Sequence, residues 1–137
     1  MSTQQQSLSG WVTQINDALF IQPNDEIALK AVNEQVDPSL VVNHISRINH
    51  NVYSYDQFKQ GLQYARTSST SIQDEFSVIL QWENPERPDG VVAVLSKWTS
   101  KDKTSGKETK KTNVILWEVK SIDGQRKLTG QTEVESV

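Results

Sequence analysis

Cysteine is absent from this 137-residue sequence, and its absence excludes disulfide bridges, thiolate nucleophiles and cysteine-ligated metals. Long apolar runs are absent too, so no stretch is long enough to cross a bilayer. The opening residues, MSTQQQSLSG, lack the basic region and apolar stretch of a secretory signal. The glycine signatures of a nucleophile elbow, a phosphate loop and a dinucleotide-binding turn are also missing. We therefore expect a cytoplasmic protein that is not a hydrolase, a kinase or a nicotinamide enzyme.

Aromatic residues are few, at 7%, and the net charge of −3 gives no overall attraction to nucleic acid. Seven of the fourteen basic residues nevertheless lie between positions 97 and 120, around one expected hairpin. An anion-binding patch is one interpretation of the lysine-rich segment 97–111. The alternative is a solvated turn whose lysines keep sheet edges from pairing with other chains. We favour the second, because no aromatic side chain is interleaved there for base stacking, and we expect no nucleic-acid partner.

The second half of the chain predicts four successive strands. Val, Ile, Thr and Trp dominate these runs, and segments rich in Gly, Pro, Asp and Asn separate them, which is typical of an antiparallel meander. The expected strands are Phe76–Glu83, Val91–Thr99, Thr109–Ser121 and Lys127–Ser136.

Side chains on these strands alternate between two faces. The face expected to point inward carries Phe76, Val78, Leu80, Trp82, Val92, Val94, Trp98, Ile115, Trp117 and Val119. The other face is partly apolar as well, with Ile79, Val91, Ala93, Leu95, Val114 and Leu116. An apolar outer face usually has a cover, and we expect that cover to be a second copy of the chain.

The first half predicts three helices. Apolar residues at spacings of three and four mark the first over Ser7–Phe20. Asn24 is a plausible N-cap for a second that ends near Gln35, before the helix-breaking Asp37-Pro38. Ser54 and Gln57 form a capping box at the start of the third.

Two further segments connect these elements. Leu40–Asn51 predicts a short strand with an irregular exit, and Thr67–Ser71 predicts a loop into the sheet. Helices that precede an antiparallel sheet indicate the α+β class, with the helices covering one face.

Several of these segments resemble the SnoaL-like polyketide cyclase/isomerase family of the nuclear transport factor 2-like superfamily. They are HNVYSYDQFKQGL (His50–Leu62), VVAVLSKWT and NVILWEVKSIDGQRKL, together with Asp37 before the first strand, where the family has an acid. The resemblance implies a cone, or cystatin-like α+β roll, in which three helices pack on a curved, mostly antiparallel sheet. It also implies one domain over residues 1–137, with 1–6 flexible, a pocket between helices and sheet, and a homodimer through the convex sheet face.

The candidate acid/base residues are His50, His44 and Glu133. Imidazole is suited to proton transfer near neutral pH, and the spacing of six residues places both histidines on one face if the strand is regular. Glu133 lies on the last strand, where the family often has a base. Apolar alternation of Leu128, Thr132 and Val134 instead favours an outward Glu133. The two histidines lack a convincing third ligand, so we expect neither metal nor cofactor.

The candidate substrate-binding residues are mainly aromatic. Aromatic walls with a few amides suit a flat hydrophobic ligand, although tryptophans on strands are more often plain core. The candidates are Trp11, Tyr53, Tyr64, Trp82, Trp98, Asn113 and Trp117.

Two hypotheses follow. The first is a cofactor-independent isomerase, cyclase or dehydratase that acts by acid/base proton transfer on a polyketide- or terpenoid-like carbonyl compound. The alternative is a non-catalytic module of the same fold that binds a ligand or dimerises.

Overall fold

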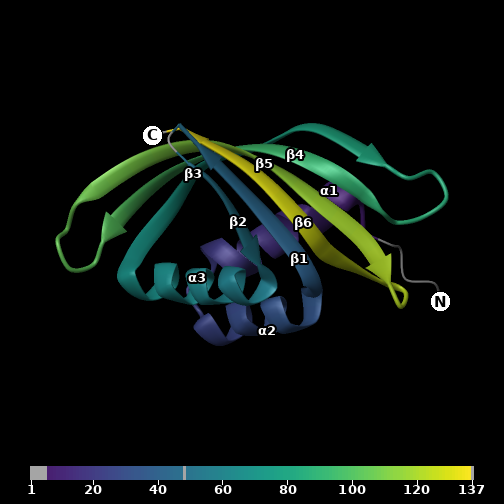
Figure 1. Cartoon of the computed structure of the whole chain (residues 1–137), viewed down its shortest axis with the longest axis horizontal. Helices are drawn as coiled ribbons and strands as arrows, with labels where there is room; N and C mark the ends of the chain where they lie inside the picture. Colours follow the sequence, from purple (N-terminus) through teal and green to yellow (C-terminus); the bar gives the residue numbers. More distant parts are fainter. Residues whose placement is uncertain (1–5, 48, 137) are drawn as a thin grey trace.

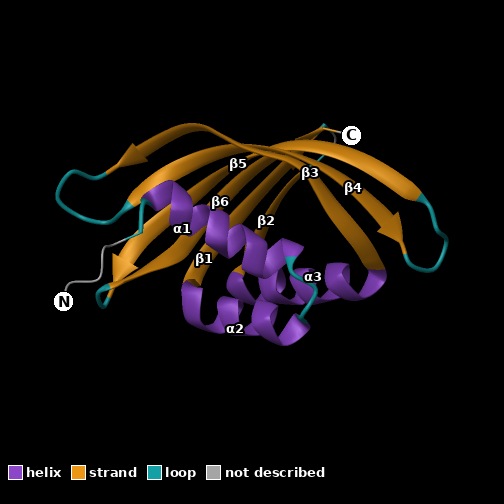
Figure 2. Cartoon of the chain, turned by 180° about the vertical axis from the view of Figure 1, so that it is seen from behind, coloured by secondary structure: helices purple, strands orange, loops and turns teal. Residues whose placement is uncertain are grey.

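Three α-helices lie on one side of a strongly curved six-stranded sheet in the computed structural model, which describes residues 6–47 and 49–136 (Figures 1 and 2). The expected α+β cone is therefore confirmed. The helical elements are α1 (Leu8–Asn16), the π-helix η1 (Asp17–Ile21), α2 (Asp25–Gln35) and α3 (Tyr55–Ser68). The strands are β1 (Val36–Ser46), β2 (His50–Ser54), β3 (Ser69–Glu83), β4 (Gly90–Asp102), β5 (Glu108–Ile122) and β6 (Gln125–Ser136). None of the helices in the described ranges is long and apolar enough to span a membrane.

Side-chain caps fix where the helices begin. Asn24 accepts hydrogen bonds from the backbone amides of Glu26 and Ile27 at the start of α2. Ser54 and Gln57 make the reciprocal capping box at the start of α3. Each cap satisfies amides that the first turn leaves unpaired. These two helix starts are as the sequence predicts.

The π-helix η1 continues α1 and was not expected. It holds Leu19 in the core and brings Phe20 against the rings of Trp98 and Trp117, with centroids 6.2 and 6.3 Å apart. Single π-helical turns are often found next to functional sites. Here the turn supplies one wall of the cavity described below.

The sheet order is β2-β1-β6-β5-β4-β3, and all neighbours are antiparallel except β1 and β6. The first strand has eleven residues, begins at Val36, four residues earlier than the predicted segment, and turns back into β2 as a hairpin. The expected loop at Thr67–Ser71 is wrong, because α3 runs to Ser68 and β3 begins directly at Ser69.

The concave face of the sheet carries the core. Val92, Val94, Trp117 and Val119 are buried against apolar side chains of the helices, so the predicted alternation on β4 and β5 is confirmed. Burial of such side chains stabilises the fold by about 1.5–3 kcal/mol each before entropy is counted.

The expected inward face of β3 is partly wrong. A register shift lies between Val78, opposite Val94, and Leu80, opposite Ala93. The extra residue, Ile79, reverses the alternation. Leu80 is consequently on the convex face with Ala93 and is 72% exposed, and Trp82 is 58% exposed.

A second bulge decides the orientation of β6. Val119 pairs with Leu128 but Glu118 pairs with Gly130, so Thr129 is an extra residue on β6. Leu128 is fully buried before the bulge, and the odd-numbered residues Gln131 and Glu133 face inward after it. The expected inward set of Thr132 and Val134 is therefore wrong, and Val134 is 53% exposed.

Candidate functional site

A cavity of about 700 Å³ lies between the helices and the concave face of the sheet. Its volume is within the range usual for small-molecule sites. Part of its lining is apolar and comes from η1, α3 and the sheet. The apolar lining residues are Leu19, Phe20, Ile21, Val42, Phe58, Leu62, Trp98 and Ile115.

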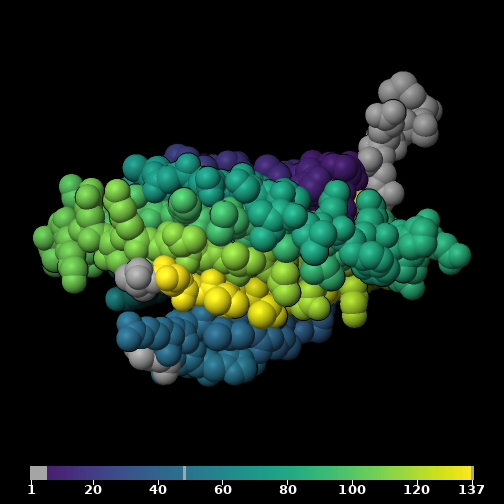
Figure 3. Space-filling model, turned by 90° about the horizontal axis from the view of Figure 1, so that it is seen from above, coloured from purple at the N-terminus to yellow at the C-terminus, as the bar shows by residue number. Residues whose placement is uncertain are grey.

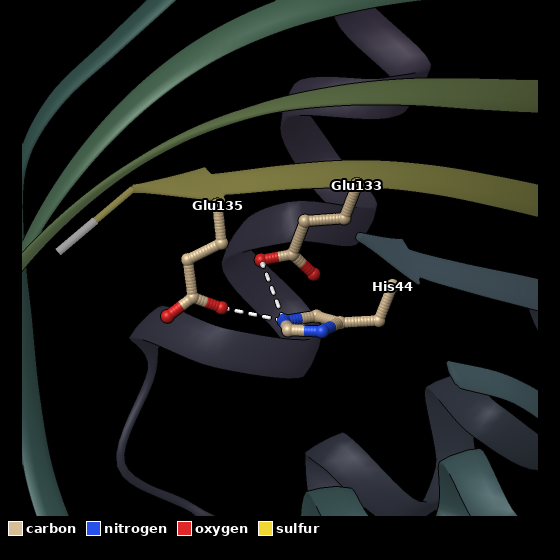
Figure 4. Close-up of side chains that lie close together, drawn as sticks. All are labelled: His44, Glu133 and Glu135. Atoms are coloured by element: carbon tan, nitrogen blue, oxygen red, sulfur yellow. Dashed lines mark hydrogen bonds and ion pairs between the residues drawn. The ribbon is translucent and has the colours of Figure 1, made fainter. Parts of the chain in front are cut away.

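Charged and polar groups from β1, β5 and β6 also line the cavity, as do Asp25, Arg66 and Lys103. His44 on β1 is the register partner of Glu133 on β6, and Glu135 follows two residues later on the same face. The His44 Nε2 atom is 2.5 Å from Glu135 Oε2 and 4.0 Å from Glu133 Oε1 (Figure 4). The parallel pairing of β1 with β6 thus joins groups 91 residues apart.

The pKa of Glu133 is raised above its ordinary value. Burial raises the pKa of its carboxyl, and the charge of Glu135 raises it further. The charges of His44 and Lys111 and a 2.9 Å hydrogen bond from Asn113 Nδ2 oppose this rise without cancelling it.

Glu135 favours the ionised form, although it is only two residues away. Burial acts to raise the pKa of Glu135, but hydrogen bonds from His44 and Lys111 outweigh burial and lower it. The Lys111 Nζ atom is 3.1 Å from Glu135 Oε1. The pKa values of the two neighbouring carboxyls are therefore shifted in opposite directions, the arrangement that helps to separate an acid from a base.

The hydrogen bond to Glu135 also constrains His44. A carboxylate accepts hydrogen bonds only, so the His44 Nε2 atom carries a hydrogen. Nδ1 is buried and has no hydrogen-bond partner within residues 6–47 and 49–136. Glu135 thus fixes the orientation of the imidazole ring.

The same three side chains also form a cluster of metal-ligand types. The two histidines do not form a metal pair, but His44, Glu133 and Glu135 offer ligand atoms within 4.8 Å of one another. Imidazole and carboxylate donors suit divalent cations. However, Lys111 and His44 already bind both oxygens of Glu135, and the ammonium group of Lys111 supplies a positive charge next to this carboxylate.

Five of the ten residues chosen from the sequence line the cavity: His44, Glu133, Tyr53, Trp98 and Asn113. His50 does not. The chain turns back between β1 and β2, so Asn51 is opposite His44 and His50 is opposite Ile45, on the other face. His50 is exposed there, with Nε2 3.4 Å from Asn43 Oδ1.

The other four candidates are also away from the cavity walls. Trp11 and Trp117 are in the core, 7% and 0% exposed, which is the plain structural role weighed for them. Tyr64 is 74% exposed on α3, and Trp82 is on the exposed part of β3 described above.

Sequence reasoning did not assign Gln131, Glu135 or Lys111 to the site. Their signal was present in part: Gln131, Glu133 and Glu135 form a polar set on alternate positions of the last strand. Only the bulge at Thr129 turns that set inward.

The sequence matches no protein-family model and no curated protein. Solved structures do match it. A ketosteroid isomerase-like protein from Erwinia carotovora atroseptica superposes with a TM-score of 0.66 at 10% identity, covering 93% of this chain and 88% of that one. The chain has the nuclear transport factor 2-like fold.

Two other relatives of this fold are similar to the chain. A candidate scytalone dehydratase from Novosphingobium aromaticivorans gives a TM-score of 0.65 at 9% identity, covering 92% of this chain and 82% of that one. A candidate SnoaL-like polyketide cyclase from Mesorhizobium loti gives 0.58 at 15% identity, covering 93% and 98%. Identities this low establish the fold of the chain, and its function has to be argued from the site.

Proposed function

We propose that this protein is a cofactor-independent enzyme that moves a proton within a hydrophobic, carbonyl-bearing small molecule, as an isomerase, cyclase or dehydratase. The observation that carries the proposal is the Glu135–His44 pair beside a buried Glu133 on one wall of the cavity. Proton transfer next to a carbonyl needs a base and an acid that coexist near neutral pH.

The three side chains have separate roles in this proposal. The His44 imidazole removes a proton from the carbon next to the carbonyl. Glu135 stabilises the imidazolium that forms, as a carboxylate beside a histidine does in other enzymes. Glu133, whose pKa is raised by burial, donates its proton to the enolate oxygen or to a second carbon, and the proton on His44 restores the acid when the cycle closes.

Two further observations support a hydrophobic substrate. The cavity lining includes aliphatic and aromatic side chains such as Phe20, Leu62 and Ile115. Structures similar to this one include proteins described as ketosteroid isomerase-like, as a scytalone dehydratase and as a polyketide cyclase. A ring system with a carbonyl group matches both the apolar lining of the cavity and its acid/base residues.

The test is deuterium exchange. The protein is incubated in D₂O with 4-phenylcyclohexanone, and exchange of the hydrogens next to the carbonyl is followed by NMR. Exchange faster than in a solution with the Glu133→Gln variant supports the proposal, because glutamine keeps the shape of the side chain but has no transferable carboxyl proton. Equal rates for the two proteins would remove Glu133 from the mechanism.

A second candidate function, dimerisation, is favoured by the convex face. Figure 3 looks onto this face, where the strands lie side by side from teal through green to yellow. Large apolar side chains are exposed on it: Leu80 at 72%, Leu116 at 40% and Val134 at 53%. We propose that a second copy of the chain covers this patch. Dimerisation is then either a property of the enzyme or, if the protein is not an enzyme, its main role.

A further inference from the structure

A single arginine on α3 holds the end of η1, the helical turn that supplies part of the apolar cavity lining. The side chain of Arg66 is only 13% exposed. Its Nη1 atom donates to the backbone carbonyl of Leu19 at 3.0 Å, and its Nη2 atom donates to the carbonyl of Gln22 at 2.8 Å. Its Nε atom donates to Asp25 Oδ1 at 2.8 Å. One side chain thus joins α3 to η1 and to the start of α2.

The local sequence leaves these two carbonyls without their usual helical donors. Four residues after Leu19 is Pro23, which has no N–H. The amide five residues after Leu19, the partner in a π-helix, is that of Asn24, and it donates to Gln22 Oε1 at 2.7 Å. Four residues after Gln22 is Glu26, whose amide donates to Asn24 Oδ1 at 2.9 Å. The end of η1 is therefore held from outside, by a side chain of α3.

The same helical turn carries an aromatic side chain close to the titratable cluster. Phe20 lies between the two residues that Arg66 holds, and its ring packs edge-on against Trp98 with centroids 6.2 Å apart. Trp98 is opposite Lys111 on β5, and Lys111 Nζ is 3.1 Å from Glu135 Oε1. A shift of η1 would therefore change the apolar surface that a ligand meets beside the acid/base residues.

We propose that Arg66 is a positioning residue that sets the ligand preference of the cavity by holding η1 and Phe20 against Trp98. The inference deepens the proposed function and rests on it for the identity of the cavity as the substrate site. Without the two carbonyl bonds, η1 loses its outside support and the Phe20 ring moves away from the sheet. A large ligand then loses apolar contact that a small ligand never makes, so the preference for the larger ligand falls.

Calorimetric binding of cyclohexanone and 4-phenylcyclohexanone tests the inference, because the two ketones differ by one phenyl ring. The wild-type protein is expected to bind the larger ketone more tightly. Arg66→Met is expected to reduce the ratio of the two association constants about tenfold, since the phenyl ring loses part of its contact with η1. If Arg66 only stabilised the fold, the variant would weaken both ketones to the same extent and leave the ratio unchanged.

Two further variants separate the guanidinium from other contacts of α3. Arg66→Lys keeps the charge but not the planar fork, so it is expected to keep only part of the preference, and it replaces Arg66→Met if that variant does not fold. Lys59→Met is the matched control, because Lys59 also joins α3 to α2, through a 2.8 Å hydrogen bond from its Nζ atom to Asn33 Oδ1, and does not line this cavity. Its affinity ratio should equal that of the wild-type protein.

Amide hydrogen exchange, measured by mass spectrometry, gives a second readout that needs no ligand. In Arg66→Met, the amides of residues 17–22 are expected to exchange about tenfold faster than in the wild-type protein, while those of α1 and β6 keep their protection. In Lys59→Met, all three segments should keep it.

An unchanged affinity ratio in the Arg66 variants would overturn the inference, as would unchanged amide exchange of residues 17–22 or an equal loss of preference in Lys59→Met. These results leave the proposed function untouched, because deuterium exchange of the ketone hydrogens judges it separately. Absence of binding of both ketones to the wild-type protein would overturn the inference and the proposed function together.

Discussion

The two faces of one sheet differ in a way that reverses the usual placement of residues. The concave face holds His44, Glu133 and Glu135, partly buried in the cavity. The convex face exposes large apolar side chains such as Leu80 and Val134. Scattered apolar residues on a surface are ordinary, but a partly buried cluster of titratable groups and a broad apolar patch both require an explanation. The contrast is the reason for proposing chemistry inside the cone and association on its outside.

The largest expected effect separates the two histidines. His44→Gln is expected to lower the rate of carbonyl-dependent proton exchange by about 10²–10⁴-fold, because it removes the base. His50→Gln makes the same chemical change on the opposite face and should leave the rate unchanged. NMR exchange rates on both variants measure the difference. A loss of equal size in His50→Gln would mean that the face assignment is wrong.

The next effect concerns the convex face. Leu116→Lys places a charge within the apolar patch and should weaken self-association by about a hundredfold or more, since like charges would meet across a symmetric interface. Tyr64→Lys is the matched control, because Tyr64 is 74% exposed on α3, on the helical side of the molecule. Sedimentation equilibrium at micromolar concentrations gives the association state. A wild-type monomer would refute dimerisation through this face.

A smaller effect compares the two carboxyls of the concave face by stability. The pKa of Glu133 is raised in the folded state. Its contribution to the free energy of unfolding is therefore fully present below the pKa of the unfolded chain and is lost as pH rises through the pKa of the folded protein. The pKa of Glu135 is lowered in the folded state. Its contribution to the free energy of unfolding is therefore present above the pKa of the unfolded chain and is lost as pH falls through the pKa of the folded protein.

The two glutamine variants should therefore change stability in opposite directions at neutral pH. Glu133→Gln is expected to gain about 1 kcal/mol relative to the wild-type protein and Glu135→Gln to lose about 1–2 kcal/mol, because only the second breaks charge-assisted hydrogen bonds. Urea unfolding at pH 4 to pH 8 measures both. Parallel pH curves for the two variants would contradict the opposite pKa shifts.

Local features of the sequence predicted the parts of the fold that local forces determine. The caps at Asn24 and Ser54 act within three residues, and the buried alternation on β4 and β5 follows from strand geometry. The resemblance to the family added the cone itself.

The composition of the site depends on long-range pairing that alternation does not encode. Thr129 is a bulge because of how β6 pairs with β5, and that single extra residue turns Glu133 and Glu135 inward. The even spacing of His44 and His50 suggested one face, but a hairpin separates them. The contact between His44 and Glu135 exists only because β1 lies parallel to β6.

The smallest expected effect compares two adjacent lysines, one that lines the cavity and one that is exposed. Lys111 lines the cavity and its Nζ atom is 3.1 Å from Glu135 Oε1, whereas Lys110 is exposed and makes no ion pair among the residues that the structure describes. Lys111→Met should allow the pKa of Glu135 to move back toward its ordinary value, with a loss of about 0.5–1 kcal/mol at neutral pH, the scale of a partly exposed ion pair.

Lys110→Met removes the same charge one residue away and should leave both the stability and its pH dependence unchanged. The decisive readout is the interaction of Lys111→Met with Glu135→Gln. If the ammonium acts through that carboxylate, the double variant is no less stable than Glu135→Gln alone. Additive losses would show that Lys111 stabilises the fold by some other contact, and that the ionised state of Glu135 depends on His44 alone.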